Sequence, residues 1–312
     1  MEMKLVDHEW LEININSIKV KTLQEFFNKY VLSKRVQYKL LSNRLIYVDS
    51  VSIIDRNQKL EGDCMRLKVY ENEHVDYNCK CIYFPLKILY EDDFLLIVNK
   101  PSGINVHSCG NGEVTLRDWV NHYCISKQIP CKPHPIHRLD KETSGLIIFS
   151  KSYVFQPLFD AMIATKIIKR EYIAIVKGYM KKGYRTVFTE SIGKDKKNSN
   201  KRGVDFKGQK AITHIESLYT DRIISIVRCV LDTGRTHQIR VHLSYHNYPI
   251  LNDPYYGIKS NRIKGMGLYS YDISFVHPLN ERELHISLGM NEIFNQLRIE
   301  ENIIDFVDAK QH

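Results

Sequence analysis

The segment His137–Gly145 constrains this chain most, because a run of four large apolar residues, Leu146–Phe149, follows it directly. An apolar run that follows a glycine in this way predicts a buried β-strand. Arg138 and Asp140 stand two positions apart just before it, so we expect both on a loop at the mouth of the strand. Loops held by a rigid scaffold often carry binding and catalytic groups. The alternative is a structural Arg–Asp pair that closes a turn.

The length of 312 residues predicts a small module and a larger one. No apolar run approaches the ~20 residues that cross a bilayer, and the N-terminus lacks the apolar region of a signal peptide. The seven cysteines are an odd number without the spacing of a disulfide framework. We therefore expect reduced thiols and a cytoplasmic protein without a membrane partner.

The net charge of +9 is concentrated in one part of the chain. Residues 166–210 hold 14 Lys and Arg against 4 Asp and Glu, whereas residues 1–84 hold 13 against 12. A basic block of this kind predicts contact with a polyanion, since basic side chains release counterions from phosphates. The stretch Lys194–Arg202 is equally compatible with a solvated, partly disordered insertion. Charge alone does not choose among RNA, DNA and a membrane.

Residues 1–76 are predicted to form a separate α+β module. Ser33 is a candidate N-cap for a basic helix that ends at Asn43. Short strands are expected at Leu45–Val48 and Met65–Val69. A further helix precedes them, because four apolar residues lie on one of its faces: Leu23, Phe26, Phe27 and Tyr30.

Residues 77–312 are predicted to form the larger module, in which strands and helices mix without regular βαβ alternation. The pattern predicts two strands joined by an acidic turn, several later strands, and helices at 114–125 and 155–163. Gly234–Leu243 is predicted to begin a helix with Thr236 as its cap. A strand is the alternative there, because the apolar positions 239, 241 and 243 also alternate. The fold class is therefore α+β.

The nine residues His137-Arg138-Leu139-Asp140-Lys141-Glu142-Thr143-Ser144-Gly145 resemble the signature of the RluA/RluD-like pseudouridine synthases. Further stretches resemble the same family, and together they span about residues 88–290. They are Val98–Gly103 with His107, the strand around Tyr172, Gly234–Leu243, Asn252–Gly257 and Phe275–Pro278.

The resemblance assigns a role to individual residues. It implies that Asp140 is the catalytic residue, that Tyr172 packs against the target base, and that Arg240 forms a salt bridge with Asp140. Arg235 is the weaker candidate for that partner. Arg138 would fill the gap that a flipped base leaves in the RNA. The expected substrate-binding residues are Arg138, His137, Thr143, Arg235 and Leu243.

The family resemblance also implies the architecture: a catalytic domain with a mixed, mainly antiparallel sheet and flanking helices. The first 76 residues resemble the αL RNA-binding module of some ribosomal proteins and tyrosyl-tRNA synthetases. A generic small α+β module is the alternative for that part. The chain departs from the family pattern at Asn252, where a Gly is usual, and at Tyr269–Tyr271, where Leu-His-Ala is usual. These departures concern loop geometry and subfamily.

Pseudouridine formation breaks the glycosidic bond, rotates the base and joins carbon 5 to the same ribose carbon. No redox change or group transfer occurs, so we expect neither cofactor nor metal. A carboxylate can serve as nucleophile or base, and an adjacent Arg keeps it ionised. The sequence does not decide between attack by Asp140 on the sugar and removal of a sugar proton.

Two histidine- or cysteine-containing patterns could instead bind metal. Cys124, Cys131, His134 and His137 have the spacing C-x6-C-x2-H-x2-H, which is looser than that of most zinc sites. His242 and His246 stand four apart, as in metal-binding helices, but lack the Glu of a zinc hydrolase.

The expected function is isomerisation of specific uridines in structured RNA by a cytoplasmic monomer. Large-subunit ribosomal RNA is the first choice of substrate, because an αL-like module ahead of this domain resembles the enzymes that act on it. A tRNA enzyme of the same family is the alternative. A catalytically silent RNA-binding or ribosome-assembly protein is another. An Asp-dependent glycoside hydrolase is disfavoured because no second carboxylate is evident near the signature.

Overall fold

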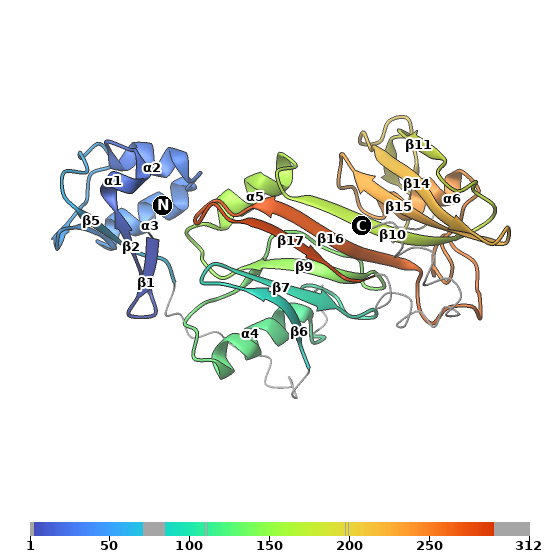
Figure 1. The fold of residues 1–312 in the computed structure, drawn as a ribbon, viewed down its shortest axis with the longest axis horizontal. Coiled ribbons are helices and arrows are strands. Elements are labelled where there is room, and N and C mark those ends of the chain that lie inside the picture. The colour runs from blue at the N-terminus through green and yellow to red at the C-terminus, as the bar shows by residue number, and fades with distance from the viewer. Residues whose placement is uncertain are drawn as a thin grey trace.

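The computed structural model describes residues 3–70, 85–108, 110, 112–196, 198 and 200–289. Two units lie side by side, and Figure 1 shows the first in blue beside the larger sheet of the second. The expected boundary near residue 76 falls outside the described residues.

The first unit is a five-stranded antiparallel sheet with three helices, in the strand order β1-β2-β5-β3-β4. Its elements are β1 (Met3–Val6), β2 (Trp10–Asn14), α1 (Ile15–Ile18), α2 (Leu23–Lys29), α3 (Lys34–Ser42), β3 (Ile46–Val48), β4 (Val51–Ser52) and β5 (Cys64–Lys68). The four apolar residues predicted to share a face of α2 are all buried. The Ser33 side chain accepts a hydrogen bond from the backbone of Val36, and α3 ends at Asn43, as expected. The strands β1 and β2 and the short α1 were not predicted.

The second unit is built on a ten-stranded sheet in the order β11-β14-β15-β10-β16-β9-β7-β6, with β17 added to β16 and β8 added to β9. Only the pairing of β16 with β9 is parallel, so the sheet is mixed and mainly antiparallel, as predicted. Its strands are β6 (Lys87–Glu91), β7 (Leu95–Lys100), β8 (His134–Pro135), β9 (Ser144–Ser150), β10 (Lys169–Lys177), β11 (Arg185–Phe188), β14 (Thr213–Thr220), β15 (Ile224–Leu231), β16 (Leu268–Val276) and β17 (Glu283–Ser287).

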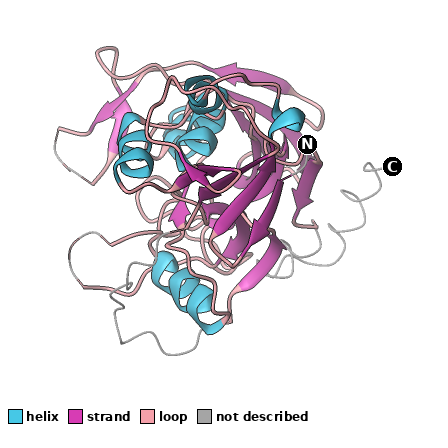
Figure 2. Ribbon diagram, turned by 90° about the vertical axis from the view of Figure 1, so that its left-hand side faces the viewer, coloured by secondary structure: helices cyan, strands magenta, loops and turns pink. Residues whose placement is uncertain are grey.

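The helices of the second unit are short and lie outside the sheet (Figure 2). They are α4 (Leu116–Ser126), α5 (Gln156–Ala164) and α6 (Gln238–Tyr245). The first two confirm the predicted helices to within two residues. No helix in the described part of the chain has both the length and the apolar character needed to cross a membrane.

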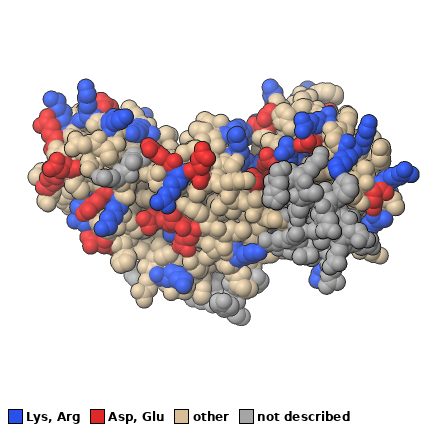
Figure 3. All heavy atoms as spheres, in the orientation of Figure 1, with Lys and Arg blue, Asp and Glu red and all other residues tan. Residues whose placement is uncertain are grey.

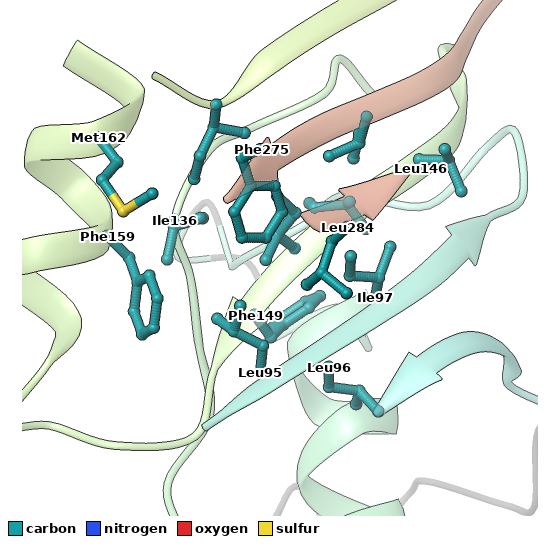
Figure 4. Close-up of a cluster of buried hydrophobic side chains, with 14 of the residues drawn as sticks. Leu95, Leu96, Ile97, Ile136, Leu146, Phe149, Phe159, Met162, Phe275 and Leu284 are labelled. Carbon is teal, nitrogen blue, oxygen red and sulfur yellow. The ribbon is translucent and has the colours of Figure 1, made fainter. Parts of the chain in front are cut away.

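Strand β9 is buried along its whole length, as the apolar run after Gly145 predicted. Figure 4 shows Phe149 of β9 packed among Leu95, Leu284 and Phe275. At the start of the strand, Gly145 has a φ of +112°, and a Cβ there would lie 2.0 Å from the carbonyl oxygen of Ser270 in β16. Only glycine therefore allows β9 to approach β16 at the point where the Asp140 loop enters the sheet.

The two units share one continuous hydrophobic core. The ring of Phe155 packs edge-to-face against two other rings. Its centroid lies 5.9 Å from that of Tyr30 in the first unit and 5.5 Å from that of Phe94 in the second. The Ser152 hydroxyl donates to the carbonyl of Val69 at 2.9 Å. Because these contacts are buried, the first unit is fixed against the sheet.

Candidate active site

Asp140 is held by a buried arginine that bridges two carboxylates. The Arg240 Nη1 atom donates to Asp140 Oδ2 at 2.8 Å, while Nε and Nη2 donate to Asp253 Oδ2 and Oδ1 at 2.7 and 2.8 Å. The Arg240 side chain is 2% exposed and that of Asp253 is fully buried, whereas Asp140 is 26% exposed. Only the Asp140 end of this network therefore faces solvent.

The charges of this network stabilise one another. Burial alone would lower the pKa of Arg240, but the hydrogen bonds and charges of Asp253 and Asp140 raise it above its usual range. Burial would raise the pKa of Asp253, yet Arg240 and the backbone N–H groups of Tyr255 and Tyr256 lower it. The site therefore contains a permanent guanidinium cation beside an ionised buried carboxylate.

Lys100 at the end of β7 anchors the loop that carries Asp140. Its Nζ atom donates to the carbonyls of Pro101, Ile104 and Lys141, each at 2.9 Å. The backbone N–H of Thr143 also donates to the carbonyl of Asp140 at 3.1 Å, which closes the turn. Burial lowers the pKa of Lys100 to about 7, although nearby carboxylates oppose the shift. Lys100 is fully buried, so it supports the loop rather than contacting RNA.

Helix α6 presents Arg240 to this site. The segment is helical rather than extended, and its first residue is Gln238. The expectation that Thr236 caps it was wrong: His237 occupies the N-cap position with left-handed backbone angles, and no side chain caps the helix. The Gln238 side chain instead stabilises the preceding turn, accepting from the backbone of Arg235 and the Thr233 hydroxyl.

Tyr172 lies two strands away from the Asp140 loop. It pairs with Ser270 in β16, and Ser270 pairs with Gly145 at the start of β9. The register with β16 shifts between Glu171 and Tyr172, a bulge of the kind that re-aims side chains near active sites. Tyr172 is largely buried, and its contact with a base remains a prediction.

The other predicted site residues occupy different environments. Arg138 is exposed. Burial lowers the pKa of His107, and the positive charge of Arg138 lowers it further. Arg235 is also exposed and donates to the carbonyl of Lys210, so Arg240 rather than Arg235 is the partner of Asp140. The remaining three are buried, and their roles in substrate binding stay predictions: His137, Thr143 and Leu243.

Three residues near Asp140 were not assigned a role from the sequence. Asp253 holds Arg240, and the His237 Nε2 atom lies 3.8 Å from Asp140 Oδ2. The third is Tyr256, whose ring lies 5.2 Å from the Arg240 guanidinium. All three lie in stretches that resemble the family, but the sequence alone did not show that they lie close to Asp140.

The two metal-site alternatives do not assemble in the described residues, where no three His, Cys, Asp or Glu side chains are arranged to hold an ion. Cys124 and Cys131 are buried free thiols. His137 Nε2 accepts from the backbone of Ile148. His242 and His246 both contact Glu190, the first through its carbonyl and the second through its carboxylate.

Comparisons with known proteins agree on one family. A family model described as RNA pseudouridylate synthase matches residues 94–245. The ribosomal large subunit pseudouridine synthase C of Buchnera aphidicola is 32% identical over 312 residues, covering 91% of this chain and 95% of the relative. An uncharacterized RNA pseudouridine synthase of Bacillus subtilis is 34% identical over 253 residues, covering 80% and 82%.

The chain belongs to the RNA pseudouridine synthase family. Among solved structures, human RNA pseudouridylate synthase domain containing 4 shares the fold, with a TM-score of 0.55 and 22% identity over 69% of this chain and 94% of that chain. The departure from the family pattern at Asn252 has a structural explanation. Its φ is +57°, a left-handed conformation that Asn tolerates better than most residues. Its side chain also bonds the backbone of Ser260 and Ile263.

We predict that Arg240→Met lowers the free energy of unfolding by about 3–5 kcal/mol at pH 7, because Asp253 is then a buried charge without a partner. The contribution of Asp253 to the free energy of unfolding should also change with pH in the opposite direction. In the wild type the lowered pKa of Asp253 adds stability that is lost as pH falls through that pKa. In the variant burial raises this pKa, so the deficit should be smaller at pH 5 than at pH 7.

Urea unfolding of both proteins at the two pH values measures this difference. Arg185→Met is the matched control, because Arg185 pairs with Glu216 on the surface and should cost at most about 1 kcal/mol. A similar small loss in Arg240→Met would show that the network does not hold the site together.

Proposed function

We propose that this protein isomerises specific uridines of large-subunit ribosomal RNA to pseudouridine, with Asp140 as the essential residue. The observation that carries the proposal is the Arg240 guanidinium at 2.8 Å from a partly exposed Asp140 carboxylate. Relatives named as ribosomal large subunit pseudouridine synthases C and D favour this substrate. We further propose a cytoplasmic enzyme that acts as a monomer.

The reaction needs little beyond the side chains already described at this site. The bond from the base nitrogen to the ribose carbon breaks, the base rotates, and carbon 5 bonds to the same ribose carbon. Carbon 5 gives up a proton and the freed nitrogen gains one, so atoms balance without oxidant, reductant or group donor. Either role, attack on the sugar or removal of a sugar proton, uses a carboxylate, and Arg240 donates a hydrogen bond to that of Asp140.

The carboxylate of Asp140 has one oxygen available for this chemistry. In the described part of the chain, Oδ2 accepts the hydrogen bond from Arg240 and is also the oxygen that faces His237. Oδ1 is therefore the oxygen we assign to the reacting ribose. Tyr172 would stack on the displaced base and exposed Arg138 would fill its place in the RNA, which offsets part of the few kcal/mol that unstacking costs.

A basic ribbon beside the site is the proposed RNA contact of the catalytic unit. The ribbon consists of β12 (Ile192–Lys194) and β13 (Arg202–Val204) with the turns that flank them, through residue 210. In Figure 3, Lys and Arg outnumber Asp and Glu over the part of the molecule that contains β11 and β14. Phe206 on the ribbon is 96% exposed, as a residue that stacks on an RNA base would be. Among its described residues, the exposed lysines are Lys194, Lys196, Lys207 and Lys210.

The first unit is the proposed recognition module, in the domain division 1–76 and 77–312. A cavity of about 550 Å³ opens beside α3, with two cations and a 75% exposed tyrosine in its wall. An exposed aromatic ring in a cavity that is also lined by cations suits an unpaired nucleotide. The lining residues are Lys34, Gln37, Tyr38, Leu41, Ser42, Ile54 and Arg56. This face supports the αL-type interpretation, and the module should add affinity and selectivity but no chemistry.

We predict that the purified protein forms pseudouridine at discrete positions of large-subunit ribosomal RNA taken from cells that lack the gene. Chemical mapping of pseudouridine before and after incubation measures the change. The same experiment on bulk tRNA from those cells tests the alternative. Modification of tRNA alone would overturn the proposed substrate, and modification of neither RNA would overturn the proposed function.

We also predict that Lys194→Ala/Lys196→Ala weakens RNA binding and flattens its salt dependence. If each lysine contacts one phosphate, the slope of log affinity against log salt should decrease by about 1.5 in magnitude. Lys87→Ala/Lys127→Ala removes the same charge from β6 and the end of α4, away from the ribbon, and serves as the control. Equal slopes for the two variants would show that the ribbon does not contact RNA.

A further inference from the structure

His237 has an unusual backbone conformation next to Asp140. Its φ of +59° and ψ of +19° place it in the left-handed region, which non-glycine residues rarely adopt. Strained residues of this kind persist where the surroundings hold them and cluster at functional sites. The conformation turns the side chain of His237 toward the carboxylate of Asp140, with Nε2 3.8 Å from Oδ2.

A chain of hydrogen bonds sets the tautomer of His237. The backbone N–H of Arg202 in the ribbon donates to the Tyr256 hydroxyl at 2.7 Å. The single hydroxyl proton is then free to donate to His237 Nδ1, 2.9 Å away. A neutral imidazole that accepts at Nδ1 carries its proton at Nε2, the atom that faces Asp140.

The buried position of His237 favours this neutral form. Burial lowers its pKa, Asp140 and Asp253 oppose the shift, and Arg240 and Arg202 reinforce it. The Tyr255 ring lies against the imidazole at 5.8 Å, and Tyr256 contacts it edge-on. These are the charged and titratable groups that face His237 from the Asp140 loop, α6, the ribbon and the loop that follows Leu251.

We propose that His237 is a positioning residue, which turns an N–H toward Asp140 Oδ2 and so keeps Oδ1 directed to the reacting ribose. Arg240 binds the same Oδ2 atom from the other side. Tyr256 links His237 to the backbone of the ribbon, so a chain of hydrogen bonds runs from the surface proposed to hold RNA to His237, whose Nε2 faces the reacting carboxylate at 3.8 Å. This inference rests on the proposed isomerase function of Asp140.

Two substitutions of His237 separate this role from a purely structural one. Asn tolerates left-handed angles and can replace Nδ1 as the partner of Tyr256, but it cannot reach Asp140. Gln places an amide nitrogen near the position of Nε2. We expect His237→Asn to unfold at the wild-type temperature with kcat reduced by about 10- to 100-fold and KM for RNA unchanged. His237→Gln should retain more of kcat than His237→Asn.

The pH profile gives a second readout that does not depend on substituting His237. Tyr256→Phe removes the hydrogen bond to neutral Nδ1, which raises the pKa of His237. Protonated His237 would pair fully with Asp140 and make the carboxylate less reactive. The acid limb of kcat should therefore move to higher pH in Tyr256→Phe.

His285→Asn is the matched control. His285 lies on strand β17, and its Nε2 atom is 2.7 Å from Oδ2 of an aspartate, Asp272. It should leave kcat and the pH profile unchanged. Wild-type kcat in His237→Asn, or an unshifted acid limb in Tyr256→Phe, would overturn the positioning role. Wild-type protein without pseudouridine formation would instead refute the proposed function itself, so the two failures are distinguishable.

Discussion

The arrangement of this molecule depends on one buried guanidinium. Taking a charge out of water costs several kcal/mol unless partners surround it, and Arg240 has three hydrogen bonds to two carboxylates. Those partners come from the loop before β9 and from the loop that follows Leu251, while Arg240 itself comes from α6. The network therefore joins two neighbouring segments of the chain to a loop 100 residues away, at the point where Asp140 reaches solvent.

The scaffold around this pair fixes Asp140 more firmly than an ion pair alone would. Gly145 lets β9 meet β16 without a steric clash, and Lys100 holds the following residue of the loop through its carbonyl. The partly exposed carboxylate of Asp140 thus lies on a loop whose two ends are both anchored in the sheet. Such preorganisation lets a carboxylate act without first being ordered.

Much of this could be predicted from local sequence patterns. The apolar run after Gly145 predicted a buried strand, Ser33 predicted a helix start, and the family resemblance paired Asp140 with Arg240, which the structure brings into contact. Asp253 was missed because it bonds Arg240 across 13 residues, through a loop that has no periodicity. The left-handed backbone of His237 was missed because an adjacent threonine is the commoner helix cap, and only tertiary contacts override that preference.

The most direct test of the account is single-turnover pseudouridine formation by Asp140→Asn on saturating bound RNA. The substitution keeps the shape of the side chain and removes the charge that either mechanism requires. Asp160→Asn, on the exposed face of α5, is the control for a neutralised aspartate. The account predicts RNA binding at the wild-type level without detectable pseudouridine in Asp140→Asn and wild-type turnover in Asp160→Asn. Appreciable turnover by Asp140→Asn would contradict it.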